Sequence, residues 1–151
     1  MSQNRRSILG AALALPAALT VGAVATAAPA AAVAGGVEAG EWVDLVLEAG
    51  ITPTAGATPQ VRLVTIAGTT FLQARGQITG SLTADTKIAT LPAAFAPPTW
   101  YVRAAAPRNN SQGINACRFE INPAGSVSVY GGNTGNPITW AQFDSVQAIW
   151  R

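Results

Sequence analysis

The side chains that could carry out acid–base chemistry are few in this chain of 151 residues. Histidine is absent, which excludes Ser-His and Cys-His nucleophile pairs and the commonest metal ligand. A glycosidase needs two carboxyl groups facing each other across a cleft. Asp44 and Glu48 share one face of a predicted strand, but a solvated strand face explains them better. The sequence therefore predicts no catalytic residue and a protein that is not an enzyme.

The sequence supports neither a metal site nor a cofactor site. Zinc sites require clusters of cysteine and histidine, and Cys117 is the single cysteine. Calcium sites are dense in acidic residues, whereas Asp85 stands alone in its predicted loop. No glycine-rich phosphate loop follows a strand and opens a helix. We expect Cys117 to pack as a small apolar side chain, with pairing between chains as the alternative.

Aromatic and amide side chains offer a different chemistry, the binding of sugars. A sugar ring presents an apolar C–H face and a hydroxyl edge, which suit an exposed aromatic ring flanked by amide or guanidinium groups. We expect Trp42, Trp140 and Trp150 to make core or intersubunit contacts instead. Tyr130 and the loop 108–112 are the best surface candidates. The candidate ligand-binding residues are Trp100, Tyr101, Arg103, Arg108, Asn109, Tyr130 and Asn133, with Asn110, Gln112 and Asn136 as further polar neighbours.

Short apolar segments separated by Gly, Pro, Asn and Thr must position these residues, and this rhythm is typical of an all-β domain. In the segment 114–121, Cys117, Phe119 and Ile121 fall on the face expected to meet the core. Ala141–Ser145 could instead form a helical turn. We predict an antiparallel β-sandwich or jelly roll. The predicted strands are Trp42–Glu48, Val61–Ile66, Thr69–Thr79, Thr86–Leu91, Trp100–Ala106, Ile114–Ile121, Ser126–Tyr130 and Ile138–Trp150.

The N-terminal segment predicts export from the cytoplasm. Arg5 and Arg6 precede an uncharged apolar run, the pattern of a twin-arginine signal peptide. Small residues then offer cleavage sites after Ala27, Ala30 or Ala32. An uncleaved membrane anchor is the alternative, but the run is only weakly hydrophobic. We therefore predict a helical signal peptide at 1–32, a flexible leader at 33–40 and a β-sandwich domain at 41–151, which is secreted and has no stable membrane insertion after cleavage.

The charge of the predicted mature domain is close to neutral. The chain has nine Lys and Arg against seven Asp and Glu, and removing Arg5 and Arg6 leaves seven of each. Without a basic stripe there is no electrostatic footprint for nucleic acid or anionic lipid. A domain with one cysteine also suits an export route that carries folded proteins. We expect no nucleic-acid partner.

Several segments, taken in order, resemble the C-terminal head domain of bacteriophage tail-fibre and receptor-binding proteins. The most telling is 91–98, in which prolines fix an extended backbone and Leu91 and Phe95 can plug the core from a loop. The resemblance implies a homotrimer of jelly-roll heads with saccharide or cell-wall ligands near the tip or between protomers. The export signal departs from phage proteins and favours a bacterial protein secreted by itself. The other matching segments are 42–50, 60–63, 71–78, 121–127 and 140–150.

Two functions follow as expectations. The first is a secreted, non-catalytic, homotrimeric domain that recognises a carbohydrate or a cell-surface polymer. The second is a structural or assembly protein of the cell envelope or extracellular matrix that has no small ligand. A surface of low charge, with 11% charged residues in the whole chain, is compatible with self-association.

Overall fold

The computed structural model describes residues 36–151, apart from the side chain of Asn110. The predicted signal peptide, its cleavage sites and the start of the leader lie outside this range. All regular elements between residues 36 and 151 are strands, and the strands pair antiparallel, so the predicted all-β fold is confirmed. None of the elements in the described range is a helix that could span a membrane.

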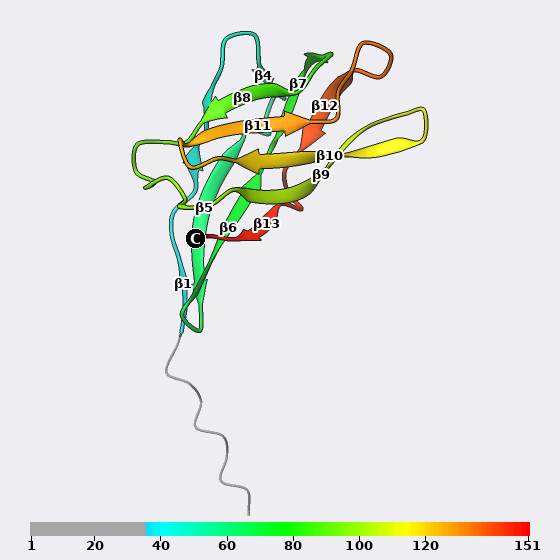
Figure 1. Ribbon diagram of the computed structural model, residues 1–151. Coiled ribbons are helices and arrows are strands. Elements are labelled where there is room, and N and C mark those ends of the chain that lie inside the picture. The colour runs from blue at the N-terminus through cyan, green and yellow to red at the C-terminus, as the bar shows by residue number, and fades with distance from the viewer. Residues whose placement is uncertain (1–35) are drawn as a thin grey trace, which may run out of the picture. The chain divides into compact units, whose positions relative to one another are not determined.

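The strands form two sheets that enclose the core (Figure 1). The smaller sheet has the order β1-β5-β6-β13, with β2 also paired to β5, and the larger has the order β3-β8-β11-β10-β9-β12-β7-β4. The bounds are β1 Val37–Ala39, β2 Val43–Asp44, β3 Val46–Leu47, β4 Thr52–Pro53, β5 Gln60–Ile66, β6 Thr69–Arg75, β7 Gln77–Leu82, β8 Thr86–Thr90, β9 Val102–Ser111, β10 Ile114–Ile121, β11 Ser126–Tyr130, β12 Ile138–Gln142 and β13 Gln147–Ile149.

Three predicted strands are each divided because the chain passes from one sheet to the other. Trp42–Glu48 becomes β2 and β3, Thr69–Thr79 becomes β6 and the start of β7, and Ile138–Trp150 becomes β12 and β13. Turn residues, and no helical turn, separate β12 from β13. Alternating hydrophobicity continues across such a corner, because a strand keeps its two-residue period when it changes sheets.

Gly76 forms the corner between β6 and β7. Its φ of 93° is a conformation that L side chains rarely adopt. A Cβ atom at this position would lie 2.3 Å from the carbonyl oxygen of Thr58. The Gly76 N–H donates to Asp144 Oδ1 at 2.8 Å, and its carbonyl accepts from Phe143 N–H at 2.8 Å. Two corners therefore meet here, since residues 143–146 link β12 to β13.

The prediction of a flexible leader at 33–40 is wrong for its last residues. Val37–Ala39 form β1, which pairs with Val64, Thr65 and Ile66 of β5, and Gly40 N–H donates to the Leu63 carbonyl at 2.9 Å. The side chains of β1 are exposed. Backbone pairing to the free edge of β5 therefore orders this segment, and a composition poor in bulky residues does not prevent it.

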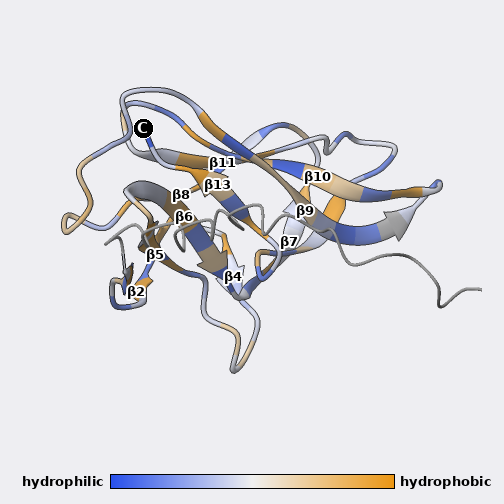
Figure 2. Cartoon of the chain, turned by 90° about the horizontal axis from the view of Figure 1, so that it is seen from below, coloured by the Kyte–Doolittle hydropathy of each residue, from blue (hydrophilic) through white to orange (hydrophobic). Residues whose placement is uncertain are grey.

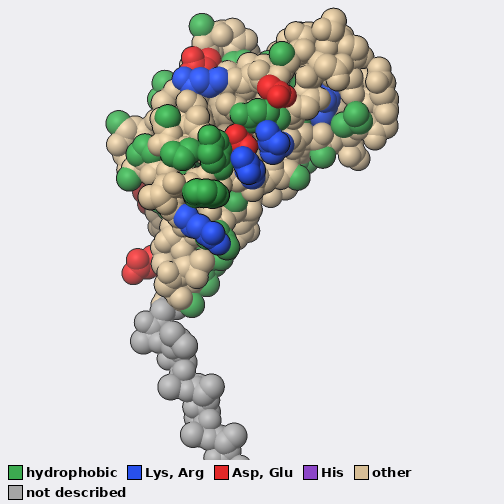
Figure 3. Space-filling model, in the orientation of Figure 1, with side chains coloured by type: hydrophobic (Ala, Val, Ile, Leu, Met, Phe, Trp, Pro, Cys, Tyr) green, Lys and Arg blue, Asp and Glu red, His purple; other side chains and the backbone are tan. Residues whose placement is uncertain are grey.

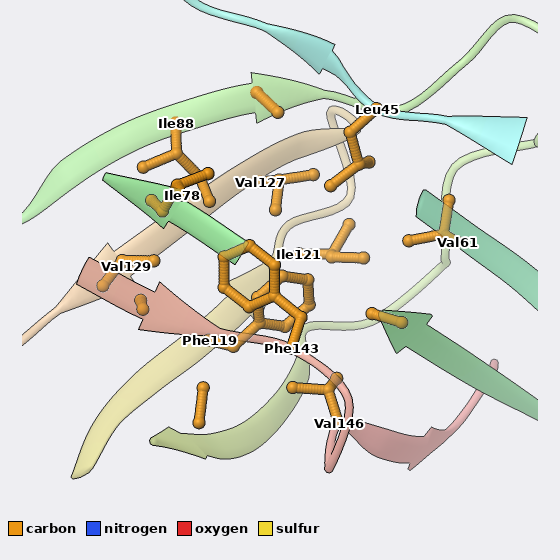
Figure 4. Close-up of a cluster of buried hydrophobic side chains, with 14 of the residues drawn as sticks. Leu45, Val61, Ile78, Ile88, Phe119, Ile121, Val127, Val129, Phe143 and Val146 are labelled. Carbon is orange, nitrogen blue, oxygen red and sulfur yellow. The ribbon is translucent and has the colours of Figure 1, made fainter. Parts of the chain in front are cut away.

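The core lies between the two sheets, and Phe119 and Phe143 stand at its centre with ring centroids 5.3 Å apart (Figure 4). Hydrophobic and hydrophilic positions follow each other along the strands, as the colouring of Figure 2 shows. Cys117, Phe119 and Ile121 are buried as predicted. In the loop after β8, Leu91 is buried and Phe95 packs against the core, which also agrees with the sequence.

Candidate functional site

A group of charged and aromatic side chains occupies the outer face of the larger sheet, where β9, β10 and β11 are neighbours. Arg103 on β9 lies directly opposite Glu120 on β10, and Arg118 on β10 lies opposite Tyr130 on β11. Tyr101 precedes β9 on the same side. The two-residue period of the strands places these side chains outward while their sequence neighbours fill the core. We call Tyr101, Arg103, Arg118, Glu120 and Tyr130 the charged aromatic cluster.

One carboxylate holds both arginines of the cluster. Arg103 Nε lies 2.6 Å from Glu120 Oε2, and Arg118 Nε lies 3.4 Å from the same oxygen. Glu120 is buried, with only 4% of its surface exposed, because the two arginines cover it. The hydrogen bond to Glu120 raises the pKa of Arg103 above its ordinary value. The guanidinium groups are therefore fixed in position and permanently charged.

Each arginine also stacks on a tyrosine. The Cζ atom of Arg118 lies 4.0 Å from the ring centroid of Tyr130, and that of Arg103 lies 5.0 Å from the ring centroid of Tyr101. These are favourable cation–π distances. The order Tyr101, Arg103, Glu120, Arg118 and Tyr130 is thus one connected chain of contacts across three strands.

An open groove runs beside the cluster. It has a volume of about 790 Å³, and its walls include Asp85, Arg103, Arg118 and Tyr130. Asp85 Oδ1 accepts a hydrogen bond from Gly131 N–H at 3.0 Å, which joins the loop before β8 to the loop after β11. Figure 3 shows basic and acidic side chains side by side on this face, next to hydrophobic ones. The groove offers donors, acceptors and apolar surface at fixed positions.

Trp100 lies at a different hollow from Tyr130. It is the most exposed of the large aromatic residues between 36 and 151, with 68% of its surface accessible. Its hollow is shared with Tyr101, Arg103 and Ile149. Tyr101 and Ile149 are each 47% exposed, so this edge of the domain carries an apolar patch. Arg103 lines both hollows and connects the patch to the cluster.

Arg108, predicted as a surface ligand-binding residue, is buried with 1% of its surface exposed. The segment 108–111 is the continuation of β9 and is not a loop. Arg108 Nη1 donates to the Gly131 carbonyl at 2.9 Å, and Nη2 donates to Asn136 Oδ1 at 2.7 Å and to the Pro137 carbonyl at 2.9 Å. The prediction was wrong because strand alternation points this side chain inward, where it anchors the loop 131–137.

The amide candidates near Arg108 are also engaged within the fold. Asn109 Nδ2 donates to the Pro137 carbonyl at 3.1 Å, and Asn109 Oδ1 accepts from Thr139 N–H at 2.8 Å. Asn133 Oδ1 accepts from the backbone N–H groups of Gly135 and Asn136. Gln112 Nε2 donates to the Gly135 carbonyl at 2.9 Å. Asn109 and Gln112 therefore fasten the β9–β10 hairpin to the loop 131–137, and Asn133 stabilises the loop itself.

The candidate residues thus separate into two groups. Tyr101, Arg103 and Tyr130 belong to the charged aromatic cluster, with Trp100 beside it, whereas Arg108, Asn109 and Asn133 belong to the loop anchor. Sequence reasoning missed Arg118, Glu120 and Asp85 as site residues. The alternation along β10 could have revealed Arg118 and Glu120, because both face away from the core side of that strand.

Asp44 and Glu48 lie on different sheets, and Cys117 is buried. Asp44 lies on β2 and accepts from Gln60 Nε2 at 2.6 Å, while Glu48 follows β3 in the other sheet and pairs with Lys87. The expectation that Asp44 and Glu48 share one strand face is therefore wrong. Cys117 is buried, and its Sγ donates to the Ala106 carbonyl at 3.3 Å. Burial raises the pKa of this thiol to about 11, which suits the predicted role as an apolar packing residue.

Comparison with known proteins gives structural likenesses only. No family model matches the sequence, and no curated protein matches it. The receptor-binding protein gp15 of Listeria phage PSA is similar at a TM-score of 0.54 and 15% identity, over 78% of this chain and 67% of that chain. The head domain of phage bIL170, a lactococcal phage receptor-binding domain, is similar at a TM-score of 0.50 and 16% identity, over 74% of this chain and 98% of that chain. The domain has the fold of phage receptor-binding heads.

Proposed function

We propose that this protein is a secreted, non-catalytic binding domain that recognises a carbohydrate or another cell-surface polymer through the charged aromatic cluster. The observation that carries the proposal is the connected set of two arginines, one shared carboxylate and two tyrosines beside an open groove. The Listeria phage structure is that of a receptor-binding protein and the lactococcal one is a head domain described as a receptor-binding domain, and this likeness supports a binding role.

The cluster matches the surface of a sugar in its chemistry. Arg103 uses its Nε for the hydrogen bond to Glu120. Its side chain is half exposed, so the terminal guanidinium N–H groups face solvent as donors. Tyr101 and Tyr130 add flat apolar surface and hydroxyl groups. Because Glu120 and the tyrosine rings hold the guanidinium groups, little side-chain freedom is lost when a ligand binds.

Binding to surface polysaccharides tests this function. The mature domain is applied to an array of purified bacterial cell-wall polysaccharides, with Tyr130→Ala and Arg118→Gln as site variants and Glu38→Gln, on exposed β1, as the control. We expect binding that falls at least about tenfold in the site variants, equivalent to about 1.4 kcal/mol, and is unchanged in the control. Failure of the folded domain to bind any polysaccharide would argue strongly against the proposal.

The proposal includes assembly as a homotrimer, in keeping with the resemblance to phage head domains. Size-exclusion chromatography with light scattering over a concentration series is expected to give a constant trimer mass. The patch of Trp100, Tyr101 and Ile149 favours the second candidate function, structural assembly, because exposed apolar patches promote association. A mass that grows with concentration would support that candidate.

Export by the twin-arginine route is the last part of the proposal and rests on Arg5 and Arg6. Replacing both with lysine keeps the charge of the segment but removes the paired guanidinium groups. We expect the variant precursor to accumulate in the cytoplasm while the unchanged chain appears outside it, measured by fractionation and immunoblotting. Equal export of both chains would contradict this route.

A further inference from the structure

The outer face of the smaller sheet carries a second polar group of residues, on a different sheet from the strands of the charged aromatic cluster. The strand registers place Trp42 beside Arg62, with Gln73 and Gln147 continuing the same row across β6 and β13. Asp44, Gln60 and Arg75 form the next row. These side chains share a face because each lies an even number of residues from its neighbour along its own strand.

Hydrogen bonds and stacking hold this group in a fixed arrangement. Arg62 Nε donates to Gln73 Oε1 at 2.9 Å, and Arg75 Nε donates to Gln60 Oε1 at 2.6 Å. The Cζ atoms of the two arginines lie 4.5 Å and 4.3 Å from the ring centroid of Trp42. Trp42 is therefore a positioning residue that fixes two guanidinium groups. In the described chain, the side-chain partners of Arg75 engage its Nε, which leaves its terminal N–H groups as outward donors.

Two hollows meet at Arg75 and Asp144. One has a volume of about 570 Å³ and also borders Thr58, Gln60 and Gly76. The other has a volume of about 310 Å³ and also borders Trp42, Gln73 and Gln147. Volumes of this order are typical of small-molecule sites. Arg75 and Asp144 line both hollows, so the two hollows lie side by side on this face. An extended ligand of more than one ring can therefore occupy both.

Asp144 supplies a fixed acceptor beside the Arg75 donor. Its Oδ1 accepts from Gly76 N–H at 2.8 Å, and hydrogen bonds from Gln142 and Gly76 lower its pKa, so the carboxylate is ionised at neutral pH. Arg75 and Asp144 make no ion pair within 4.0 Å among residues 36–151, so each keeps bonding capacity. Adjacent hydroxyl groups of a sugar can accept from Arg75 and donate to Asp144 together.

The charges on this face cancel. Arg62 and Arg75 are balanced by Asp44 and Asp144, so the face does not attract a polyanion. We propose that the outer face of the smaller sheet is a second binding site, specific for a neutral oligosaccharide, with Arg75 and Asp144 as the principal contacts. It does not depend on the charged aromatic cluster, and a domain with both sites holds two ligand chains on different sheets.

Nuclear magnetic resonance tests the site with the mature protein and neutral pentasaccharides of glucose, mannose, galactose or rhamnose. At about 10 mM ligand, well above a millimolar Kd, at least one sugar is expected to shift the indole N–H signal of Trp42 and the amide signals of β5, β6 and β13. Arg75→Gln and Asp144→Asn should each raise the Kd at least tenfold, whereas Tyr130→Ala should leave it within twofold.

The outcomes separate the two sites. Loss of the Trp42 shift in Arg75→Gln but not in Tyr130→Ala supports the second site, whether or not the charged aromatic cluster binds anything. The proposal is overturned if no neutral sugar shifts the Trp42 signal, or if the shift persists unchanged in Arg75→Gln. Preserved amide dispersion and melting temperature of each variant show that a lost signal reports the site and not the fold.

Discussion

Arg108 illustrates how a single side chain can be assigned to the wrong role when its surroundings are unknown. Burial of a guanidinium is costly unless its donors are satisfied. Carbonyl oxygens and one amide accept from its Nη1 and Nη2, whereas its buried Nε has no hydrogen-bond partner and no carboxylate pairs with it in the described chain. The residue type alone suggested a surface contact, but strand alternation points the Arg108 side chain inward, where it anchors the loop 131–137.

Arg108→Met should therefore destabilise the domain strongly. The Asn136 side chain and the carbonyl groups of Gly131, Asn136 and Pro137 would lose a donor, at about 1–3 kcal/mol for each acceptor shielded from water. We therefore expect a loss of at least about 3 kcal/mol in the free energy of unfolding, measured by urea denaturation. Arg103→Met is the matched control, because the Arg103 side chain is half exposed and Arg118 still pairs with Glu120 in the variant, so the loss should be clearly smaller. Equal losses in the two variants would show that Arg108 is not an anchor.

The buried thiol of Cys117 is expected to make the domain less stable as the pH becomes alkaline. Burial raises its pKa from an ordinary value of 9.0 to about 11. Between these values the unfolded chain releases the proton and the folded chain retains it, so stability is full below about pH 9 and declines as the pH rises toward 11. We expect this decline, up to about 1 kcal/mol per pH unit, in the unchanged protein and not in Cys117→Ala, when urea midpoints are compared from pH 7 to 10.5. Parallel curves would contradict the shift.

At the scale of elements, the sequence predicts which face of a strand meets the core better than it predicts how many strands there are or how they pair. The alternation of β10 correctly placed Cys117, Phe119 and Ile121 in the core, because burial on one face has a period of two. It could not predict the crossings that divide three of the predicted strands, since the period continues through a corner. The cluster was found in part, through Tyr101, Arg103 and Tyr130. The sharing of the Glu120 carboxylate by two arginines could not be predicted, because it depends on the pairing of β9 with β10, which no local pattern encodes.

The corner at Gly76 can be tested by adding one methyl group. Gly76→Ala would place Cβ against the Thr58 carbonyl and force a left-handed φ on alanine, so we expect a loss of more than about 3 kcal/mol. Gly113→Ala is the control, because Gly113 has a φ of 77° with open space around its Cβ position and should cost only about 1–2 kcal/mol. Thermal unfolding of both variants gives the comparison. A Gly76→Ala protein as stable as Gly113→Ala would mean that the corner is free to move.

For the whole described domain, the crossings tie the two sheets into one folding unit. The chain passes between sheets near Leu45, in the segment 54–59, at Gly76 and at 143–146, and one core cluster draws residues from both sheets. Neither sheet can lose its partner without exposing Phe119, Phe143 and the residues around them (Figure 4). We therefore expect the two sheets to unfold together.

We expect a single cooperative transition in urea. Trp42 reports on the smaller sheet and Trp140 on the larger, so tryptophan fluorescence follows both sheets and far-UV circular dichroism follows the backbone. The two signals should give the same midpoint. Two variants that keep only Trp42 or only Trp140, with the other three tryptophans replaced by phenylalanine, observe each sheet separately and should keep that agreement. Midpoints that differ between the two variants would reveal independent unfolding of the sheets.

The placement of the basic residues has a consequence for survival outside a cell. Every lysine and arginine between residues 36 and 150 lies within a strand, namely Arg62, Arg75, Lys87, Arg103, Arg108 and Arg118. Proteases of trypsin specificity cut after these residues, and nicking of native proteins concentrates at exposed loop tips. The loops of this domain offer such enzymes no target. Its lifetime in a protease-rich medium is then set by how often the entire domain opens.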